Sequence, residues 1–218
     1  VYTRFTGGGA DHDTAELVGA ELDLPDGRLR EPRVLFPAPG ALNQMSASLE
    51  RLADGAWGLV WIRKTAPDAD AIYFSRSPDE GRTWSAPVPI NRGLPDRYFV
   101  VNNDRLRQFG SGRLAVPVCI YPGGHTGKTC DLGMFYSDDG GATWGLSQRV
   151  RLLKEAMIRP ETMGPGSEAV WAEVCAFWGY QEPGVEELAD GRILMYCRTS
   201  NGYMYQAYSG DRGLTWSP

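Results

Sequence analysis

The sequence lacks any uninterrupted apolar run of the roughly 18 to 20 residues that a membrane-spanning helix needs. Even the apolar segment 169–180 contains Glu173. Positive charge is also scarce, because 22 basic residues stand against 27 acidic ones and the net charge is −5. A chain with scattered basic residues offers no electrostatic footprint for a phosphate backbone. We therefore expect neither a membrane span nor a nucleic-acid partner.

Histidine and cysteine are also few. The chain has two histidines, His12 and His125, and four cysteines at positions 119, 130, 175 and 197. The cysteines form no C-x-x-C pair and have no histidine at ligand spacing, so we expect no structural zinc site. A Ser-His-Asp triad would need one of the two histidines, and neither lies in a recognisable motif. These absences leave acidic and arginine side chains as the candidates for chemistry.

What the sequence does contain is a repeat with the pattern S-x-D-x-G-x-T-W, at 77–84, 137–144 and 209–216. The Ser and Asp side chains can bond nearby backbone N–H groups, and the Gly can adopt a positive φ. The Trp can pack back between sheets. We interpret the repeat as a structural turn between two strands.

Each copy lies in a unit of strand-like runs joined by short Gly-containing turns. The predicted runs are 1–5, 16–22 and 33–36; then 45–51, 57–63, 71–76 and near Val88; then near 106–109, 114–121, 132–136 and 149–153; and finally 184–188, 193–197 and 203–208. Four-stranded antiparallel units in tandem are the blades of a β-propeller. We predict an all-β fold, a single propeller domain over residues 1–218 with about four blades and both ends inside a blade. A four-bladed ring closed by strand exchange between the termini is the alternative.

Alternate connections of an antiparallel blade lie at opposite ends of the ring, which predicts the polar residues that share one rim. The repeated turns fall at one end. The opposite end collects polar residues from every unit: Asp11, Asp13, Asn43, Gln44, Arg63, Asn102, Asn103, Asp104, His125, Glu182 and Arg198. Carboxylates and arginines brought together in this way can supply a general acid, a base and an anion clamp. A solvated face without chemistry is the alternative interpretation.

The repeat resembles the Asp-box, or BNR repeat, of sialidases (neuraminidases) and their relatives. Segment 181–198, Q-E-P-G-V-E-E-L-A-D-G-R-I-L-M-Y-C-R, is similar to the sialidase segment N-E-x-x-V-x-E-L-x-D-G-x-L-L-x-x-x-R. In that family the Glu polarises a tyrosine nucleophile and the Arg is one of three that grip the sialic acid carboxylate. The resemblance implies these roles for Glu182 and Arg198. Segment 2–13 resembles the loop that holds the acid/base aspartate, which implies Asp11, with Asp13 as second choice.

The resemblance implies an exo-α-sialidase-like glycosidase with a six-bladed propeller when complete, a sialylated or other acidic glycan as substrate, and no metal or cofactor. Rim placement makes Arg63, Asn103 and Asp104 candidate sugar contacts. Two of the three arginines and the tyrosine have no counterpart here, so we expect this stretch to be catalytically incomplete. The alternatives are a hydrolase or lyase of another acidic sugar and a non-catalytic carbohydrate-binding propeller. Sialoglycans are extracellular, which favours a secreted or cell-surface location. Neither a signal segment nor a disulfide pattern in the sequence supports that location.

Overall fold

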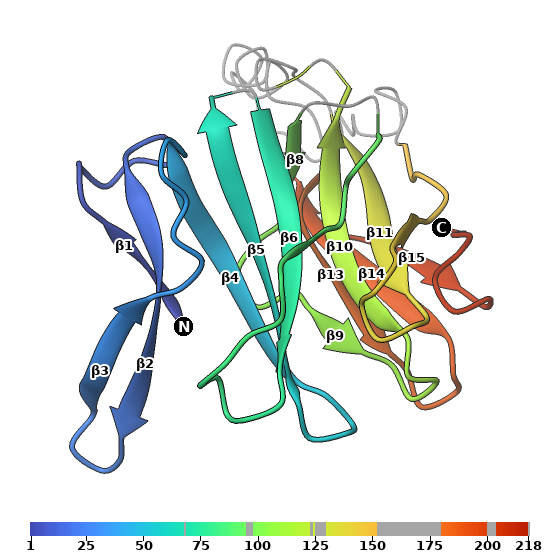
Figure 1. Ribbon diagram of the computed structural model, residues 1–218. Helices are drawn as coiled ribbons and strands as arrows, with labels where there is room; N and C mark the ends of the chain where they lie inside the picture. Colours follow the sequence, from blue (N-terminus) through green and yellow to red (C-terminus); the bar gives the residue numbers. More distant parts are fainter. Residues whose placement is uncertain are drawn as a thin grey trace, which may run out of the picture.

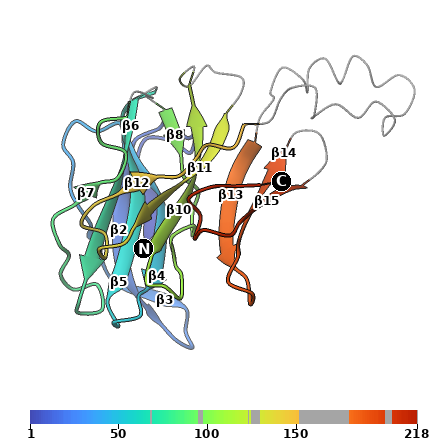
Figure 2. The ribbon, with the colours of Figure 1, turned by 90° about the vertical axis from the view of Figure 1, so that its right-hand side faces the viewer.

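The computed structural model describes residues 1–67, 69–94, 98–122, 124, 130–151, 180–199 and 204–217. Within these residues the fold is all-β, with strands and turns and no helix. No helix that could cross a membrane is found in this part of the chain. The strands form four groups that follow one another in chain order (Figure 1, Figure 2).

The first group holds β1 (Tyr2–Phe5), β2 (Ala15–Asp23) and β3 (Arg28–Val34); the second holds β4 (Asn43–Arg51), β5 (Trp57–Ala66), β6 (Ala69–Ser77) and β7 (Val88–Pro89). The third holds β8 (Tyr98–Val100), β9 (Arg107–Gln108), β10 (Leu114–Tyr121), β11 (Asp131–Ser137) and β12 (Gly145–Leu146); the fourth holds β13 (Tyr180–Glu187), β14 (Ile193–Thr199) and β15 (Met204–Ser209). Pairing is antiparallel within each group. A single parallel bridge, Ala15 to Asn43, joins the first two groups into one sheet.

The predicted all-β class and most predicted runs are confirmed by these strands. The run 114–121 coincides with β10, whereas β8 was not predicted. The predicted run 149–153 is reduced in the described residues to an isolated bridge between Leu132 and Val150, and the short strand β12 precedes it. The described strands form three open sheets, so a closed propeller remains a prediction.

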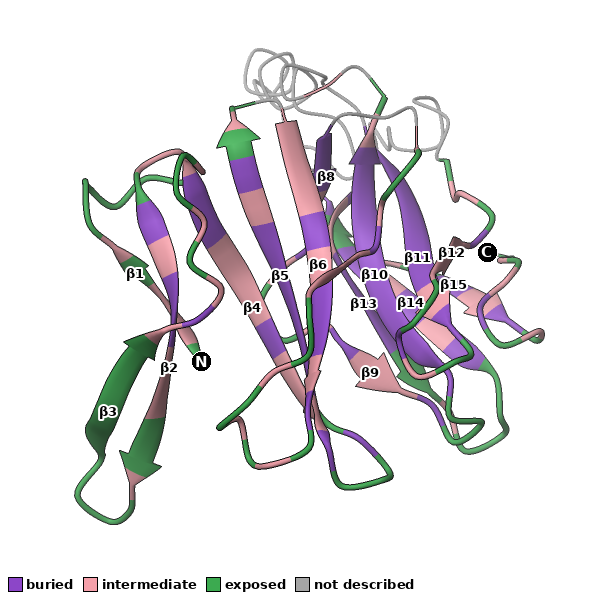
Figure 3. Cartoon of the chain, viewed as in Figure 1, coloured by how far each residue is buried: buried purple, intermediate pink, exposed green. Residues whose placement is uncertain are grey.

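Successive groups pack face to face through three apolar cores. Leu17 of the first group lies in one core with Trp61 of the second. Phe74 of the second group lies in the next core with Phe135 of the third. The third core joins the third and fourth groups. Strand β10 has neighbours on both faces, which explains its continuous apolar sequence, while β3 is exposed along most of its length (Figure 3).

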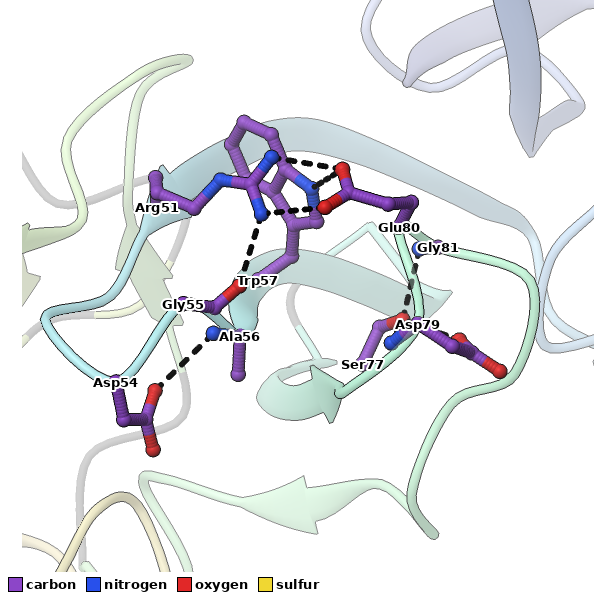
Figure 4. A network of polar contacts seen from close by, with 9 residues as sticks. All are labelled: Arg51, Asp54, Gly55, Ala56, Trp57, Ser77, Asp79, Glu80 and Gly81. Carbon is purple, nitrogen blue, oxygen red and sulfur yellow. Dashed lines mark hydrogen bonds and ion pairs between the residues drawn. The ribbon is translucent and has the colours of Figure 1, made fainter.

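The repeated turns have one hydrogen-bonding scheme. In the first copy, Gly81 N donates to Ser77 Oγ at 2.8 Å and Ser77 Oγ donates to Asp79 Oδ1 at 2.9 Å (Figure 4). Thr83 donates to Asp79 through its N–H and its hydroxyl, at 2.8 and 2.7 Å. Equivalent bonds recur at 137–143 and 209–215. These bonds confirm the interpretation of the repeat as a structural turn.

The turn tryptophans Trp84, Trp144 and Trp216 each pack against one of the three cores. Trp144 meets the ring of Phe74 edge-on with centroids 5.3 Å apart. Each turn therefore fastens its own group to a neighbouring one. The repeated turns thus lie at one end of the strands. In the second group this is the end where Arg51 pairs with Trp57 and Trp57 pairs with Ser77.

The opposite end of the groups, called the site end below, carries the predicted functional residues. Gln44 pairs with Arg63 there, and Gln181 pairs with Arg198 in the fourth group. The strand registers thus confirm that Arg63 and Arg198 lie away from the repeated turns.

Candidate active site

Three consecutive groups contain the same local bend on their first, chain-leading segment. Ser46, Asp104 and Glu182 have φ values of 58°, 55° and 54°, in the left-handed region that residues other than glycine rarely adopt. In β4 and β13 the bend lies in a register shift, between Met45 and Ser48 and between Gln181 and Gly184. Such bulges re-aim a side chain and cluster at functional sites, where the surrounding structure holds the strain.

The three bends contact one another. Asp104 N donates to Ala47 O at 3.2 Å, which connects the bends of the second and third groups. The buried Ser48 Oγ accepts from Arg105 N at 2.7 Å and Leu106 N at 2.6 Å. Arg105 Nε then donates to Pro183 O at 3.0 Å, which connects the third group to the fourth. Residues far apart in sequence are thereby brought into one continuous surface.

Glu182 and Arg198 form a two-point ion pair across β13 and β14. Arg198 Nη2 donates to Glu182 Oε1 at 2.9 Å, and Arg198 Nε lies 2.7 Å from Oε2. Both side chains are about half exposed, at 53% for Arg198 and 41% for Glu182. The hydrogen bond from Arg198 is the main cause that holds the pKa of Glu182 below its usual range. Among the described residues, Nη1 of Arg198 has no partner, so one edge of the guanidinium can receive an anion.

The loop between β1 and β2 distinguishes the two candidate aspartates. The carboxylate of Asp13 is used inside the loop, where Ala10 N donates to its Oδ2 at 2.7 Å. The carboxylate of Asp11 accepts no hydrogen bond from the described residues, and Asp11 is exposed. Its main-chain oxygen instead accepts from Asn43 Nδ2 at 2.7 Å and from Lys64 Nζ at 3.4 Å. Asp11 is therefore the aspartate whose carboxylate is free to meet a ligand.

Sequence reasoning missed two titratable side chains near Asp11, Lys64 and Asp70, which are register partners on β5 and β6. Lys64 is 4% exposed, and its ammonium lies 5.6 Å from the centre of the Tyr98 ring. Burial lowers the pKa of Lys64, while the negative charges of Asp11 and Asp70 act in the opposite direction. Burial raises the pKa of Asp70 to about 7, although Phe99 N donates to both of its oxygens at 3.2 and 3.1 Å. The available signal was a lysine that follows Arg63 at the end of the apolar run 57–62.

Two tyrosines of the third group pack against each other beside Lys64. Tyr98 and Tyr121 pair across β8 and β10, and their rings meet edge-on with centroids 5.5 Å apart. Burial raises the pKa of both phenols, and Asp11 contributes to the shift of Tyr98. Among the described residues, no hydrogen bond or ion pair joins Asp11 to Arg198.

The remaining predicted residues are placed differently. Arg63 donates through Nε to Gln44 Oε1 at 3.1 Å and stacks 4.6 Å from the centre of the Tyr73 ring, so its guanidinium faces the neighbouring side chains of its own sheet. Asp104 and Asn103 are exposed beside the bend, with Asp104 3.8 Å from Arg107. The predicted rim residue His125 lies outside the described residues.

Buried cysteines lie beneath the Glu182 bend. The thiols of Cys119 and Cys130 both donate to the carbonyl oxygen of Tyr180. The hydrogen bond with Cys130 and burial raise the pKa of the Cys119 thiol well above its usual range, and burial raises that of Cys197 to about 12. Protonated, buried thiols are poor nucleophiles and poor metal ligands. No group of three or more potential ligand residues in the described part of the chain could hold a metal ion.

A cavity of about 730 Å³ lies at the other end of the molecule, between the first two groups, and includes Leu22, Trp57 and Trp84 in its walls. None of the predicted site residues lines it. Glu80 on its wall is already engaged, since it accepts from Trp57 Nε1 at 3.0 Å and forms a two-point pair with Arg51 (Figure 4). The volume of a cavity is therefore a poor guide to the active site in this protein. The side chains at the site end are better arranged for chemistry.

Comparisons with known proteins agree on the fold. Residues 55–218 match the family described as BNR repeat-like domain. The anhydrosialidase of Macrobdella decora is 26% identical over 147 residues, which cover 65% of this chain and 16% of that protein. A protein of unknown function from Dyadobacter fermentans superposes with a TM-score of 0.68 at 17% identity, over 97% of this chain and 60% of that one. The Trypanosoma rangeli sialidase, in complex with sialic acid, has a TM-score of 0.66 at 17% identity, over 95% and 33%.

The chain thus spans less than two thirds of the length of each of these relatives. The structural likenesses, at 17% identity, establish a shared all-β fold.

Proposed function

Because the chain belongs to the family of BNR repeat-like domains, in the sialidase superfamily, we propose that it is part of a sialidase-type glycoside hydrolase. The substrate is a glycoconjugate that ends in sialic acid or a related acidic sugar. Each of the four strand groups corresponds to one blade of a propeller domain that includes residues 1–218, with the repeated turns as its Asp-boxes.

The observation that carries this proposal is the ion pair of Glu182 and Arg198 on a strained bend at the site end. The anomeric carbon of a sialoside bears a carboxylate, which repels an anionic nucleophile. A neutral tyrosine avoids this repulsion, provided that a neighbouring carboxylate accepts its proton. Arg198 keeps Glu182 ionised and fixes its orientation, which leaves the carboxylate available to accept a proton, while the same ion pair lowers its basicity. The unpartnered edge of Arg198 is available to the substrate carboxylate in a charge-assisted pair.

Asp11 supplies the second half of the chemistry. The oxygen of the leaving group needs a proton when the glycosidic bond breaks, and an exposed carboxyl on a loop can deliver it and later activate water. Sialidases with a tyrosine nucleophile depart in this way from the usual pair of carboxylates. Asp104 and Asn103, on the neighbouring bend, contact the sugar. Arg63 is a weaker candidate, because Gln44 and Tyr73 already engage it.

The test is release of the phenol from an aryl α-sialoside by the full-length protein, compared with its Asp11→Ala and Glu182→Gln variants. Removing Glu182, which takes a proton in the transition state, is expected to reduce kcat for the aryl substrate about 10²- to 10⁴-fold. Asp11→Ala is expected to cause a loss of that size with an alkyl α-sialoside, measured beside the aryl one, because the acidic phenol needs little help from a general acid. Glu186→Gln is the matched control, because Glu186 lies on the same strand and pairs with Arg107 instead. It should retain activity.

Aryl turnover that survives in Glu182→Gln, together with alkyl turnover that survives in Asp11→Ala, would show that the assigned residues are wrong. A well-folded natural protein that releases no phenol would contradict sialoside hydrolysis. Binding of acidic glycans by that inactive protein would then favour the non-catalytic alternative.

A further inference from the structure

Two buried polar side chains from neighbouring strands converge on one main-chain atom. Asn43 of β4 and Lys64 of β5 are register partners, and they are 1% and 4% exposed. Both donate to the carbonyl oxygen of Asp11, at 2.7 Å from Asn43 Nδ2 and 3.4 Å from Lys64 Nζ. Asn43 Nδ2 also reaches Asp13 O at 3.3 Å. The second strand group thus holds the apex of a loop that belongs to the first.

Burying the polar groups of Asn43 and Lys64 costs free energy, so their placement indicates a role other than packing. A buried ammonium loses its hydration, and its attraction to nearby carboxylates returns only part of that free energy. Lys64 nevertheless lies in the mostly buried strand β5, after the apolar run 57–62 and between Arg63 and Thr65. The Oδ1 atom of Asn43 is buried without a hydrogen-bond partner, a further cost. Apolar residues would stabilise the strand pair better if packing were their whole role.

The loop fixes the chain around Asp11 but does not bond the Asp11 peptide itself. Thr6 donates to Thr14 O at the base, and Asp13 N to Ala10 O and Ala10 N to Asp13 Oδ2 close the turn 10–13 that contains Asp11. They leave the peptide of Asp11 at the exposed apex. A carboxyl that transfers a proton must be held near the reacting oxygen, because a displacement of about 1 Å can cost on the order of 10²-fold in rate.

We propose that Asn43 and Lys64 are positioning residues that hold the Asp11 main chain, so that its carboxyl faces the oxygen of the leaving group. This inference rests on the proposed function, in which Asp11 is the general acid. Neither side chain touches the substrate. They act on the proton transfer that accompanies cleavage of the glycosidic C–O bond, in which the leaving oxygen takes the proton of the Asp11 carboxyl.

Leaving-group dependence tests the proposal in the full-length protein. An aryl α-sialoside releases an acidic phenol that needs little help from a general acid, whereas an alkyl α-sialoside releases an alcohol whose oxygen must be protonated. We expect Lys64→Met and Asn43→Ala to reduce kcat/KM for the alkyl substrate on the order of 10- to 100-fold. The aryl substrate should lose at most about threefold under the same displacement of Asp11.

The ratio of the two kcat/KM values is the decisive quantity. A variant that is partly unfolded loses activity toward both substrates equally, so the ratio is independent of the amount of active protein. Lys64→Arg, which retains a cation and its donors, should recover part of the ratio. Arg30→Met removes an exposed positive charge on β3 and should leave the ratio unchanged.

Asp11→Ala separates the two hypotheses. If it changes the ratio and neither Lys64→Met nor Asn43→Ala does so, the positioning role is refuted while the proposed function stands. If Asp11→Ala itself leaves the ratio unchanged, Asp11 is not the general acid. The assignment of Asp11 and the positioning role of Asn43 and Lys64 then fail together.

Discussion

Replacing Ser48 by alanine is expected to destabilise the protein strongly, because one buried hydroxyl oxygen serves two backbone donors of the next strand group. Ser48 is 1% exposed and accepts from Arg105 N at 2.7 Å and from Leu106 N at 2.6 Å. A buried donor left without a partner costs about 1–3 kcal/mol. Leu106 is fully buried and Arg105 half-buried, so the free energy of unfolding should fall by about 3 kcal/mol in total.

Urea denaturation, followed by tryptophan fluorescence, measures this loss. Ser111→Ala is the matched control, since the Ser111 hydroxyl lies in an exposed turn and meets Arg113 N at 3.5 Å. That variant should stay within about 0.5 kcal/mol of the natural protein. A loss below about 1 kcal/mol for Ser48→Ala would refute the reasoning, because both donors would then have found other partners.

Three further predictions concern pH and backbone conformation. Hydrogen bonds from the turn threonine lower the pKa of Asp79 to about 2, so its stabilisation is present above about pH 4 and lost as the pH falls toward 2; urea unfolding of Asp79→Asn should lack that loss. Burial raises the pKa of Asp70 to about 7, so the natural protein should lose stability as the pH rises from about 4 to 7, and Asp70→Asn should not. Gly141→Ala places a Cβ inside the Phe74 ring and should lower the free energy of unfolding by more than about 2 kcal/mol. Gly112→Ala, at a similar φ but in open space, is the control and should cost about 1 kcal/mol in the same denaturation assay.

The extent to which the sequence predicts the fold can be judged strand by strand. The run 114–121 was predicted with the bounds of β10, because a continuous apolar segment flanked by turn residues is typical of a strand buried on both faces. Strand β8 was missed, since its three residues are too short for any periodicity. The repeated turns were interpreted correctly because each of their positions has a local hydrogen-bonding role.

The candidate site was predicted less completely. Glu182 and Arg198 were both identified from one segment, which forms a single hairpin, but the ion pair between them was not predicted. Asn43 was expected on the same rim as Asp11, yet the role of Lys64 depends on contacts between two strand groups that no local pattern encodes. The left-handed conformation of Glu182 is likewise set by the bulge and its neighbours.

The recurrence of one bend with three different side chains separates the shape of this surface from its chemistry. Ser46, Asp104 and Glu182 share nearly the same φ, and they carry a hydroxyl, a short carboxylate and a longer one. A duplicated unit that preserves the bend can therefore diverge by one substitution without a change in strand pairing. Variation among descendants of such a unit is expected to concentrate at these positions, and ligand preference can change there while stability is inherited from the strands and turns.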